Sequence, residues 1–228
     1  MATIRISKIC KSPQFVYAIL AGFADIILIS FFKIHIIKVL IIAILSLIFE
    51  TVFNIYWKFI VGKRMFVYKY ACLFSCNTSY LNIIFWFEGI FILAFISDIF
   101  NLKTVSHVFV LIMSMAFILV GLLKIVADAF GIKYILNYRL KIFYLLSFAS
   151  LIITMFITKD IKNVIILVLL GLMAHVSELA MNLLVKLFSS DTYWDYIYKP
   201  YANRLSSIHN IIPFIYASAL FISLLSVF

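Results

Sequence analysis

Long runs of apolar residues constrain this chain more than any other feature. Several runs reach about eighteen residues or more, the length that a helix needs to cross about 30 Å of hydrocarbon. Hydrophobic residues make up 66% of the 228 residues and charged residues 12%, and the mean hydropathy is +1.19. A soluble domain is about 45–50% apolar and about 25% charged. The sequence therefore predicts one domain, residues 1–228, embedded in a lipid bilayer.

The predicted fold class is all-α: a polytopic membrane bundle of seven transmembrane helices, or six if the terminal run does not span. The first run follows a basic start, as in a signal peptide, but it is long and contains Asp25, so we expect a retained helix. No internal repeat is evident at the residue level, and segment 65–79 is expected to be an interfacial helix or loop. The predicted spans are Phe15–Phe32, Ile36–Val61, Tyr80–Phe100, Ser106–Ala127, Leu140–Thr158, Val164–Leu187 and Ile208–Phe228.

The basic residues predict how the bundle is oriented. If seven spans alternate, the N-terminus and the second, fourth and sixth loops share one side, which holds 13 of the 19 Lys and Arg residues. The other side holds 5, and Lys124 lies within a span. Because cytoplasmic loops are enriched in Lys and Arg, we expect a multi-pass protein with a cytoplasmic N-terminus and an external C-terminus. Loop charge and attraction to anionic headgroups then account for the net charge of +10, and no nucleic-acid partner is expected.

One polar stripe interrupts the sixth run. Gly171, His175, Glu178 and Asn182 are spaced by four, three and four residues, so a helix places them on one face. A charged side chain at the centre of the bilayer costs roughly 2.5–3.5 kcal/mol. The stripe is therefore expected to face the interior of the bundle.

Three further carboxylates lie near the middle of three other spans, at depths similar to that of Glu178: Asp25, Glu50 and Glu88. Only two basic residues lie well inside spans, so ion pairs within the protein cannot neutralise all four. Intramembrane ionisable residues are candidate functional sites by default, and we interpret the set as a site for protons, cations or a cationic small solute. The alternative interpretation is structural, with hydrogen bonds between helices or contacts with another subunit.

Amides and a histidine accompany the carboxylates. Asn54 and Asn182 are candidate members of the site, although such residues commonly form hydrogen bonds between helices. His175 lies one turn from Glu178, and we expect the two to form a couple with two states that differ by one proton. A di-iron bundle needs a second Glu/His pair on another helix, and paired haem ligands at matching depth are not favoured either. We therefore expect no metal and no cofactor.

Two features lie in the connections. Cys72 and Cys76 share a helical face in a segment expected to be cytoplasmic, which predicts free thiols. Segment 191–201 is densely aromatic, which is typical of a belt at the membrane interface; a loop that binds lipid headgroups or a partner is the alternative.

Three functions remain open from the sequence. The first, which we favour, is a small transporter. The second is a non-catalytic membrane subunit of a larger export or respiratory assembly, or a homo-oligomer. The third is an intramembrane enzyme that acts on lipid, with His175 and Glu178 as acid–base groups. No nucleophile elbow, phosphate loop, zinc helix or dinucleotide fingerprint is found, which disfavours an enzyme. Six glycines and three prolines are few for a transporter with broken helices.

Overall fold

The chain folds as an all-α helical bundle. The computed structural model describes residues 12–31, 36–189 and 191–227. Six of the helices within this part are long and apolar enough to cross a membrane, which supports a multi-pass membrane protein. The helices are α2 (Pro13–Phe31), α3 (Ile36–Val61), α4 (Asn82–Phe100), α5 (Lys103–Ala129), α6 (Lys133–Thr158), α7 (Ile161–Ser189) and α8 (Ile211–Val227). The short elements are β1 (Phe66–Tyr68), β2 (Cys72–Leu73), β3 (Thr78–Ser79), β4 (Trp194–Tyr196) and the 3₁₀ helix η1 (Ile208–Asn210).

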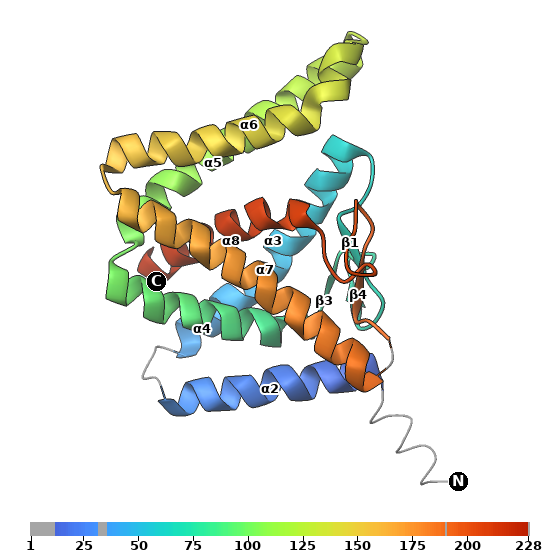
Figure 1. Cartoon of the computed structure of the whole chain (residues 1–228), viewed down its shortest axis with the longest axis vertical. Helices are drawn as coiled ribbons and strands as arrows, with labels where there is room; N and C mark the ends of the chain where they lie inside the picture. Colours follow the sequence, from blue (N-terminus) through green and yellow to red (C-terminus); the bar gives the residue numbers. More distant parts are fainter. Residues whose placement is uncertain (1–11, 32–35, 190, 228) are drawn as a thin grey trace.

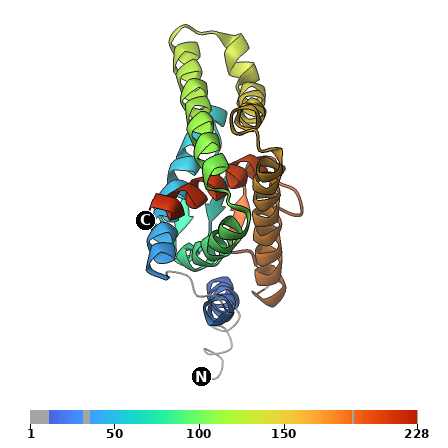
Figure 2. The same ribbon diagram turned by 90° about the vertical axis from the view of Figure 1, so that its left-hand side faces the viewer.

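Successive helices run in alternating directions across the bundle (Figure 1). The connections α3–α4 and α7–α8, with their strands, lie together at one end, and the chain leaves α8 at the opposite end. In the view of Figure 2, α2 lies at one edge of the molecule and the α5–α6 hairpin extends from the other. The central group of α3, α4, α7 and α8 lies between them.

The structure contains an internal repeat that was not evident at the residue level. Strand β1 begins at Phe66 and β4 at Trp194, so the offset is 194 − 66 = 128 residues, and at this offset α3 and α4 overlie α7 and α8. The two long loops also share their backbone conformation. Non-glycine residues with positive φ are uncommon, yet both loops contain four of them at equivalent positions. They are Ala71, Phe74, Ser75 and Cys76 in the first loop and Lys199, Ala202, Asn203 and Arg204 in the second.

The two repeats are related by a two-fold axis that passes through the paired strands. Strand β1 pairs antiparallel with β4, and Val67 lies opposite Asp195, its own equivalent. Flanking hydrogen bonds obey the same symmetry: the Lys69 amide donates to the Tyr193 carbonyl oxygen at 3.1 Å, and the Ile197 amide donates to that of Met65 at 2.8 Å. The two loops therefore form one symmetric cap at one end of the bundle.

Three helices separate α3 from α7, so the two equivalent helices cross the bundle in the same direction (Figure 1). Repeats with parallel topology are related by an axis along the membrane normal in several transporter folds. At the same offset α2 overlies the C-terminal part of α6, but these two helices pack differently. Helix α2 packs on α4 and α7, whereas α6 packs mainly on α5.

Two predictions about the loops are wrong. Cys72 and Cys76 form a disulfide bond with each other instead of remaining free thiols. The reason is local: segment 72–79 forms the β2–β3 hairpin rather than a helix, and its turn brings the two Cα atoms to 4.5 Å. The aromatic segment 191–201 does not present Tyr193, Trp194 and Tyr196 as a belt at the membrane interface, because these side chains are at most 2% exposed within the cap.

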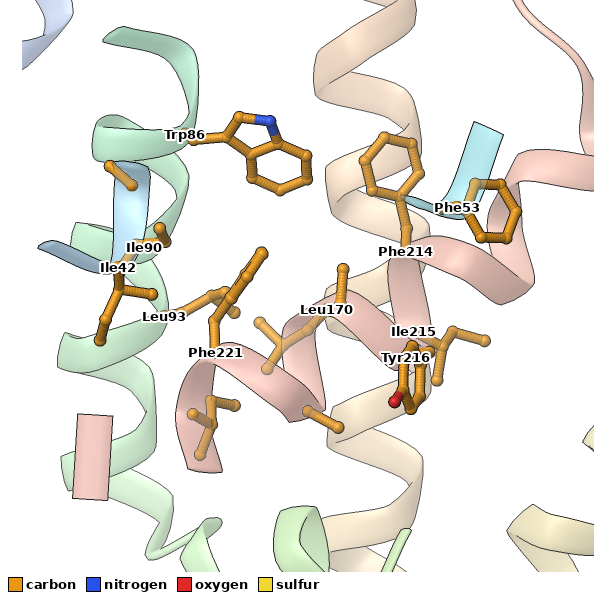
Figure 3. Packing of buried hydrophobic residues seen from close by; sticks show 14 of the residues in the cluster. Ile42, Phe53, Trp86, Ile90, Leu93, Leu170, Phe214, Ile215, Tyr216 and Phe221 are labelled. Carbon is orange, nitrogen blue, oxygen red and sulfur yellow. The ribbon is translucent and has the colours of Figure 1, made fainter. Parts of the chain in front are cut away.

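The polar stripe of α7 faces the interior of the bundle, as predicted, since Gly171, His175, Glu178 and Asn182 are all buried. Gly171 has a separate packing role. A Cβ atom at this position would overlap Ile215 Cγ1 and would lie only 2.7 Å from the Ile215 Cα atom. The absence of a side chain allows α7 and α8 to approach closely around Leu170 and Ile215 (Figure 3).

Candidate functional site

The structure brings two carboxylates from the two repeats to one cavity. Glu50 of α3 and Glu178 of α7 occupy equivalent positions and are 7% and 6% exposed. Both line an internal cavity of about 30 Å³ between the repeats. A water molecule needs about 10–15 Å³ measured in this way, so the cavity has room for about two water-sized groups.

In the first repeat, three neighbours donate hydrogen bonds to Glu50. The Tyr68 hydroxyl donates to Oε1 at 2.5 Å, and the Thr78 hydroxyl donates to Oε2. Asn82 Nδ2 lies 3.0 and 2.9 Å from the two carboxylate oxygens and 2.8 Å from the Tyr68 hydroxyl. The Tyr17 hydroxyl of α2 donates to Asn82 Oδ1 at 2.7 Å, which fixes the orientation of the amide.

The second repeat has the same arrangement around Glu178. The Tyr196 hydroxyl donates to Oε2, and Asn210 Nδ2 lies 3.0 Å from the same oxygen and 2.5 Å from the Tyr196 hydroxyl. In both repeats the tyrosine follows the glutamate by 18 residues and the asparagine follows the tyrosine by 14. We call each set of glutamate, tyrosine and asparagine a triad.

Asn54 and Asn182 position the triads. Each lies one helical turn after the glutamate, and its Nδ2 donates to the carbonyl oxygen of the residue that opens the strand, Phe66 at 2.9 Å or Trp194 at 3.1 Å. Side chains two residues apart in a strand share a face. The hydrogen bond from the asparagine fixes the first residue of the strand, and this orients the triad tyrosine, two positions later, toward the glutamate. These amides bond to the loops, whereas the sequence suggested bonds between helices.

The tyrosines of the triads remain protonated donors. Burial raises the pKa of Tyr68 well above its ordinary value of 10.0, and the neighbouring Glu50 raises it further. The pKa of Tyr196 is raised in the same way by burial and by Glu178. A hydroxyl that keeps its proton donates to a carboxylate throughout the physiological range, and such charge-assisted bonds are roughly twice as strong as neutral ones.

The wall of the cavity combines two carboxyl groups with aromatic rings. None of the described residues that line it is a lysine, arginine or histidine. Aromatic faces and carboxylates both attract cations, so the cavity favours a cation over an anion. The lining residues are Phe49, Glu50, Phe53, Phe66, Tyr68, Asn82, Phe85, Trp86, Glu178, Trp194, Asn210, Pro213, Phe214 and Ala217.

Glu88 lies at a second cavity, of about 100 Å³, between α4, α7 and α8. Its carboxylate is half-buried, and Oε2 has no hydrogen-bond partner among the described residues. The two cavities share four lining residues: Phe85, Trp86, Phe214 and Ala217. Glu88 is therefore near the two triads but not part of them, and its equivalent in the second repeat is Tyr216.

The remaining predicted residues lie apart from the cavity or outside the described part of the chain. His175 Nε2 lies 2.7 Å from the Tyr201 hydroxyl and 3.5 Å from Ser206 Oγ, while Nδ1 has no partner among the residues that the structure describes. The hydrogen bonds found for Glu178 lead to Tyr196 and Asn210 instead. Asp25 belongs to α2, but its side chain is outside the described residues.

Sequence reasoning missed Tyr68, Tyr196, Asn82 and Asn210. Their signal is present as a spacing, Glu-x3-Asn-x13-Tyr-x13-Asn, which begins at Glu50 and again at Glu178. Apart from this spacing, few residues match between the repeats. Searches with the chain matched no protein-family model, no curated protein and no solved structure.

Proposed function

We propose that the chain is a small membrane transporter that moves protons, cations or a cationic small solute through the cavity between its two repeats. The observation that carries the proposal is the pair of triads, which places two buried carboxylates at one cavity with no basic residue among the described residues that line it. Intramembrane carboxylates mark ion and proton pathways in many transporters.

The duplicated architecture supports this proposal. In transporters built from repeats, the substrate site lies at the repeat interface, and alternating access arises as one repeat rocks against the other. Here the cavity between the repeats is small, about 30 Å³. The symmetric cap of β1 and β4 holds the repeats together at one end, so we propose that the opposite end opens first.

The four carboxylates then have different roles. Glu50 and Glu178 form the binding pair, and Glu88 supplies a further negative group on the route from the second cavity. We propose Asp25 as an accessory acidic residue on α2. His175 is bonded to Tyr201 rather than to Glu178, so we do not propose a catalytic His–Glu couple or lipid chemistry.

The proposed orientation follows the charge asymmetry: N-terminus cytoplasmic and C-terminus external. Tags at both ends, probed in intact cells, test it. We expect only the C-terminal tag to be accessible, and accessibility of both tags or of the N-terminal tag alone contradicts it.

The function is tested by charge movement in proteoliposomes on a solid-supported membrane. Concentration jumps of H⁺, Na⁺, K⁺, ammonium and methylammonium are applied to the wild type, to the Glu50→Gln/Glu178→Gln double variant and to Asp98→Asn. Asp98 is an exposed carboxylate at the end of α4, with a side chain 74% exposed, and serves as the matched control.

We expect at least one cation to evoke a transient current in the wild type and in Asp98→Asn, but not in the double variant. Currents no larger than those of empty liposomes for every cation contradict the proposal and favour a non-catalytic subunit of a larger assembly. An unchanged current in a folded double variant contradicts the assigned residues.

A further inference from the structure

We propose that the transported solute is a primary amine with a short apolar tail, whose ammonium group binds between Glu50 and Glu178 while its tail occupies the adjoining cavity between α4, α7 and α8. This inference rests on the proposed function and specifies its substrate class. It is carried by the sizes, charges and shared wall of the two cavities.

The volumes of the two cavities fit a ligand that has a small head group and a longer tail. The central cavity, of about 30 Å³, accepts about two water-sized groups, and an ammonium group is of that size. The adjoining cavity, of about 100 Å³, is smaller than the engineered cavity of about 150 Å³ that holds benzene. It therefore suits a short alkyl chain rather than a large ring system.

The charges select a cation. Among the residues that the structure describes, no lysine or arginine lines either cavity, and together the two linings contain Glu50, Glu178 and Glu88. An anionic solute would meet three carboxylates, and a neutral one would leave the central pair without a counter-charge. The adjoining cavity is otherwise lined mainly by apolar side chains such as Leu93, Leu170 and Met173, which favour a hydrocarbon tail.

Trp86 and Phe214 separate the two cavities. They occupy equivalent positions of the two repeats, line both cavities, and have ring centroids 6.3 Å apart. Figure 3 shows the Trp86 indole from α4 beside the Phe214 ring from α8. A turn of the Trp86 side chain would join the head and tail cavities, and its aromatic face would then contact the ammonium group.

A buried donor also indicates a polar occupant of the central cavity. Trp194 lines this cavity, is 2% exposed, and its indole N–H has no hydrogen-bond partner among the described residues. Leaving a buried donor unpaired costs about 1–3 kcal/mol. A water molecule that accompanies the ammonium group would accept this hydrogen bond.

The test measures binding of methyl-, propyl-, butyl- and hexylammonium to the purified full-length protein by isothermal titration calorimetry, with hexanol and hexanoate as neutral and anionic controls. Each methylene that enters the apolar cavity should raise the affinity about fourfold, equivalent to ~0.8 kcal/mol, until the cavity is full. Binding should be lost in the Glu50→Gln/Glu178→Gln variant, which separates it from partition into detergent.

Gly89→Phe tests where the tail binds. Gly89 lines the adjoining cavity, and nothing lies within 4 Å of a Cβ built on it, so the new ring should fill the cavity. We expect no gain in affinity with chain length in Gly89→Phe, whereas the lipid-facing Leu111→Phe, at a residue that is 65% exposed, should show the same gain as the wild type. If Gly89→Phe does not fold, Gly89→Met provides the same test with a smaller side chain.

The inference is overturned if hexylammonium binds no more tightly than methylammonium, if no amine binds, or if the chain-length effect survives either Gly89→Phe or the double glutamine variant. These outcomes are distinct from failure of the proposed function. Cation-evoked currents that do not depend on chain length would reject the amine and retain the transporter. Absence of any cation-evoked current would reject the transporter itself.

Discussion

Val67 lies directly opposite Asp195 in the antiparallel pair of β1 and β4, and each is the residue that the other repeat places at the same position. A residue that pairs with its own equivalent marks a two-fold axis. On either side of this axis, Tyr68 and Tyr196 donate to the two glutamates that line the central cavity. The axis thus relates the two halves of the candidate site as well as the two halves of the fold.

The symmetry predicts equal effects of equivalent substitutions. Tyr68→Phe and Tyr196→Phe each remove one hydroxyl that donates to a buried carboxylate, so each should lower the free energy of unfolding by about 1–3 kcal/mol. Thermal unfolding in detergent measures both, with the exposed Tyr80→Phe as the control. A large effect of one substitution and none of the other contradicts equivalence of the triads.

Close packing of α7 on α8 predicts the effect of Gly171→Ala. The added methyl group would overlap Ile215, including its backbone, and forcing extra volume into a packed interface costs about 1–3 kcal/mol. Gly89→Ala is the matched control, because its Cβ meets nothing within 4 Å. Equal stability of the two variants in a thermal unfolding assay would contradict the close approach of these two helices.

The strand cap predicts a pH dependence through Lys69, which lies 2.8 Å from Asp191 and 3.2 Å from Asp195. The hydrogen bond from Lys69 lowers the pKa of Asp191. Burial lowers the pKa of Lys69, but hydrogen bonds to the two aspartates outweigh it and the pKa is raised. A carboxyl group whose pKa is lowered in the folded protein stabilises the fold at pH values above its ordinary pKa, and this stabilisation is lost on acidification. A lysine whose pKa is raised in the folded protein stabilises the fold at pH values below its ordinary pKa, and this stabilisation is lost in alkali.

The Lys69 cluster should therefore stabilise the cap fully between about pH 5 and pH 10. Because these side chains are partly exposed, we expect less than about 1 kcal/mol. The difference in melting temperature between the wild type and Lys69→Met should be constant over this range and shrink below about pH 4. A difference that grows on acidification would contradict the ion pairs.

The disulfide predicts a thiol count. With Cys72 and Cys76 bonded to each other, one of the three cysteines of the chain remains reactive. Denatured, unreduced protein should take up one maleimide, as measured by intact mass, and reduced protein should take up three. Three adducts without a reductant would show that the pair is not formed.

The helices could be predicted from the sequence because long apolar runs leave a chain in lipid few alternatives to a helix. The predicted span Ser106–Ala127 corresponds to α5, which extends further at both ends from Lys103 to Ala129. The added residues at the two ends include polar ones, and the prediction left them out because it ended the span where the apolar run ended. The buried stripe of α7 was predictable for a related reason: exposing Glu178 to lipid is costly, so this face of the helix must point into the bundle.

The repeat and the triads could not be predicted in the same way. Lipid-facing positions exchange Ile, Leu, Val and Phe at little cost, so the two repeats have diverged at most positions and share mainly the residues of the triads and the asparagines Asn54 and Asn182. Tyr68 and Tyr196 lie in loops whose course depends on left-handed residues such as Ala71 and Lys199, neither of which is a glycine or an asparagine that would indicate this conformation. The Cys72–Cys76 bond depends on the same loop geometry.

The central claim is that Glu50 and Glu178 act together as one cation site. Titration calorimetry with methylammonium on purified wild type, Glu50→Gln, Glu178→Gln and the exposed control Asp98→Asn tests it most directly. We predict one bound cation per chain, and a comparable loss of affinity of about 10- to 100-fold for each single glutamine, since each removes one charge-assisted contact of about 1.5–3 kcal/mol. Two independent binding events per chain, or full affinity in either single variant, would contradict it.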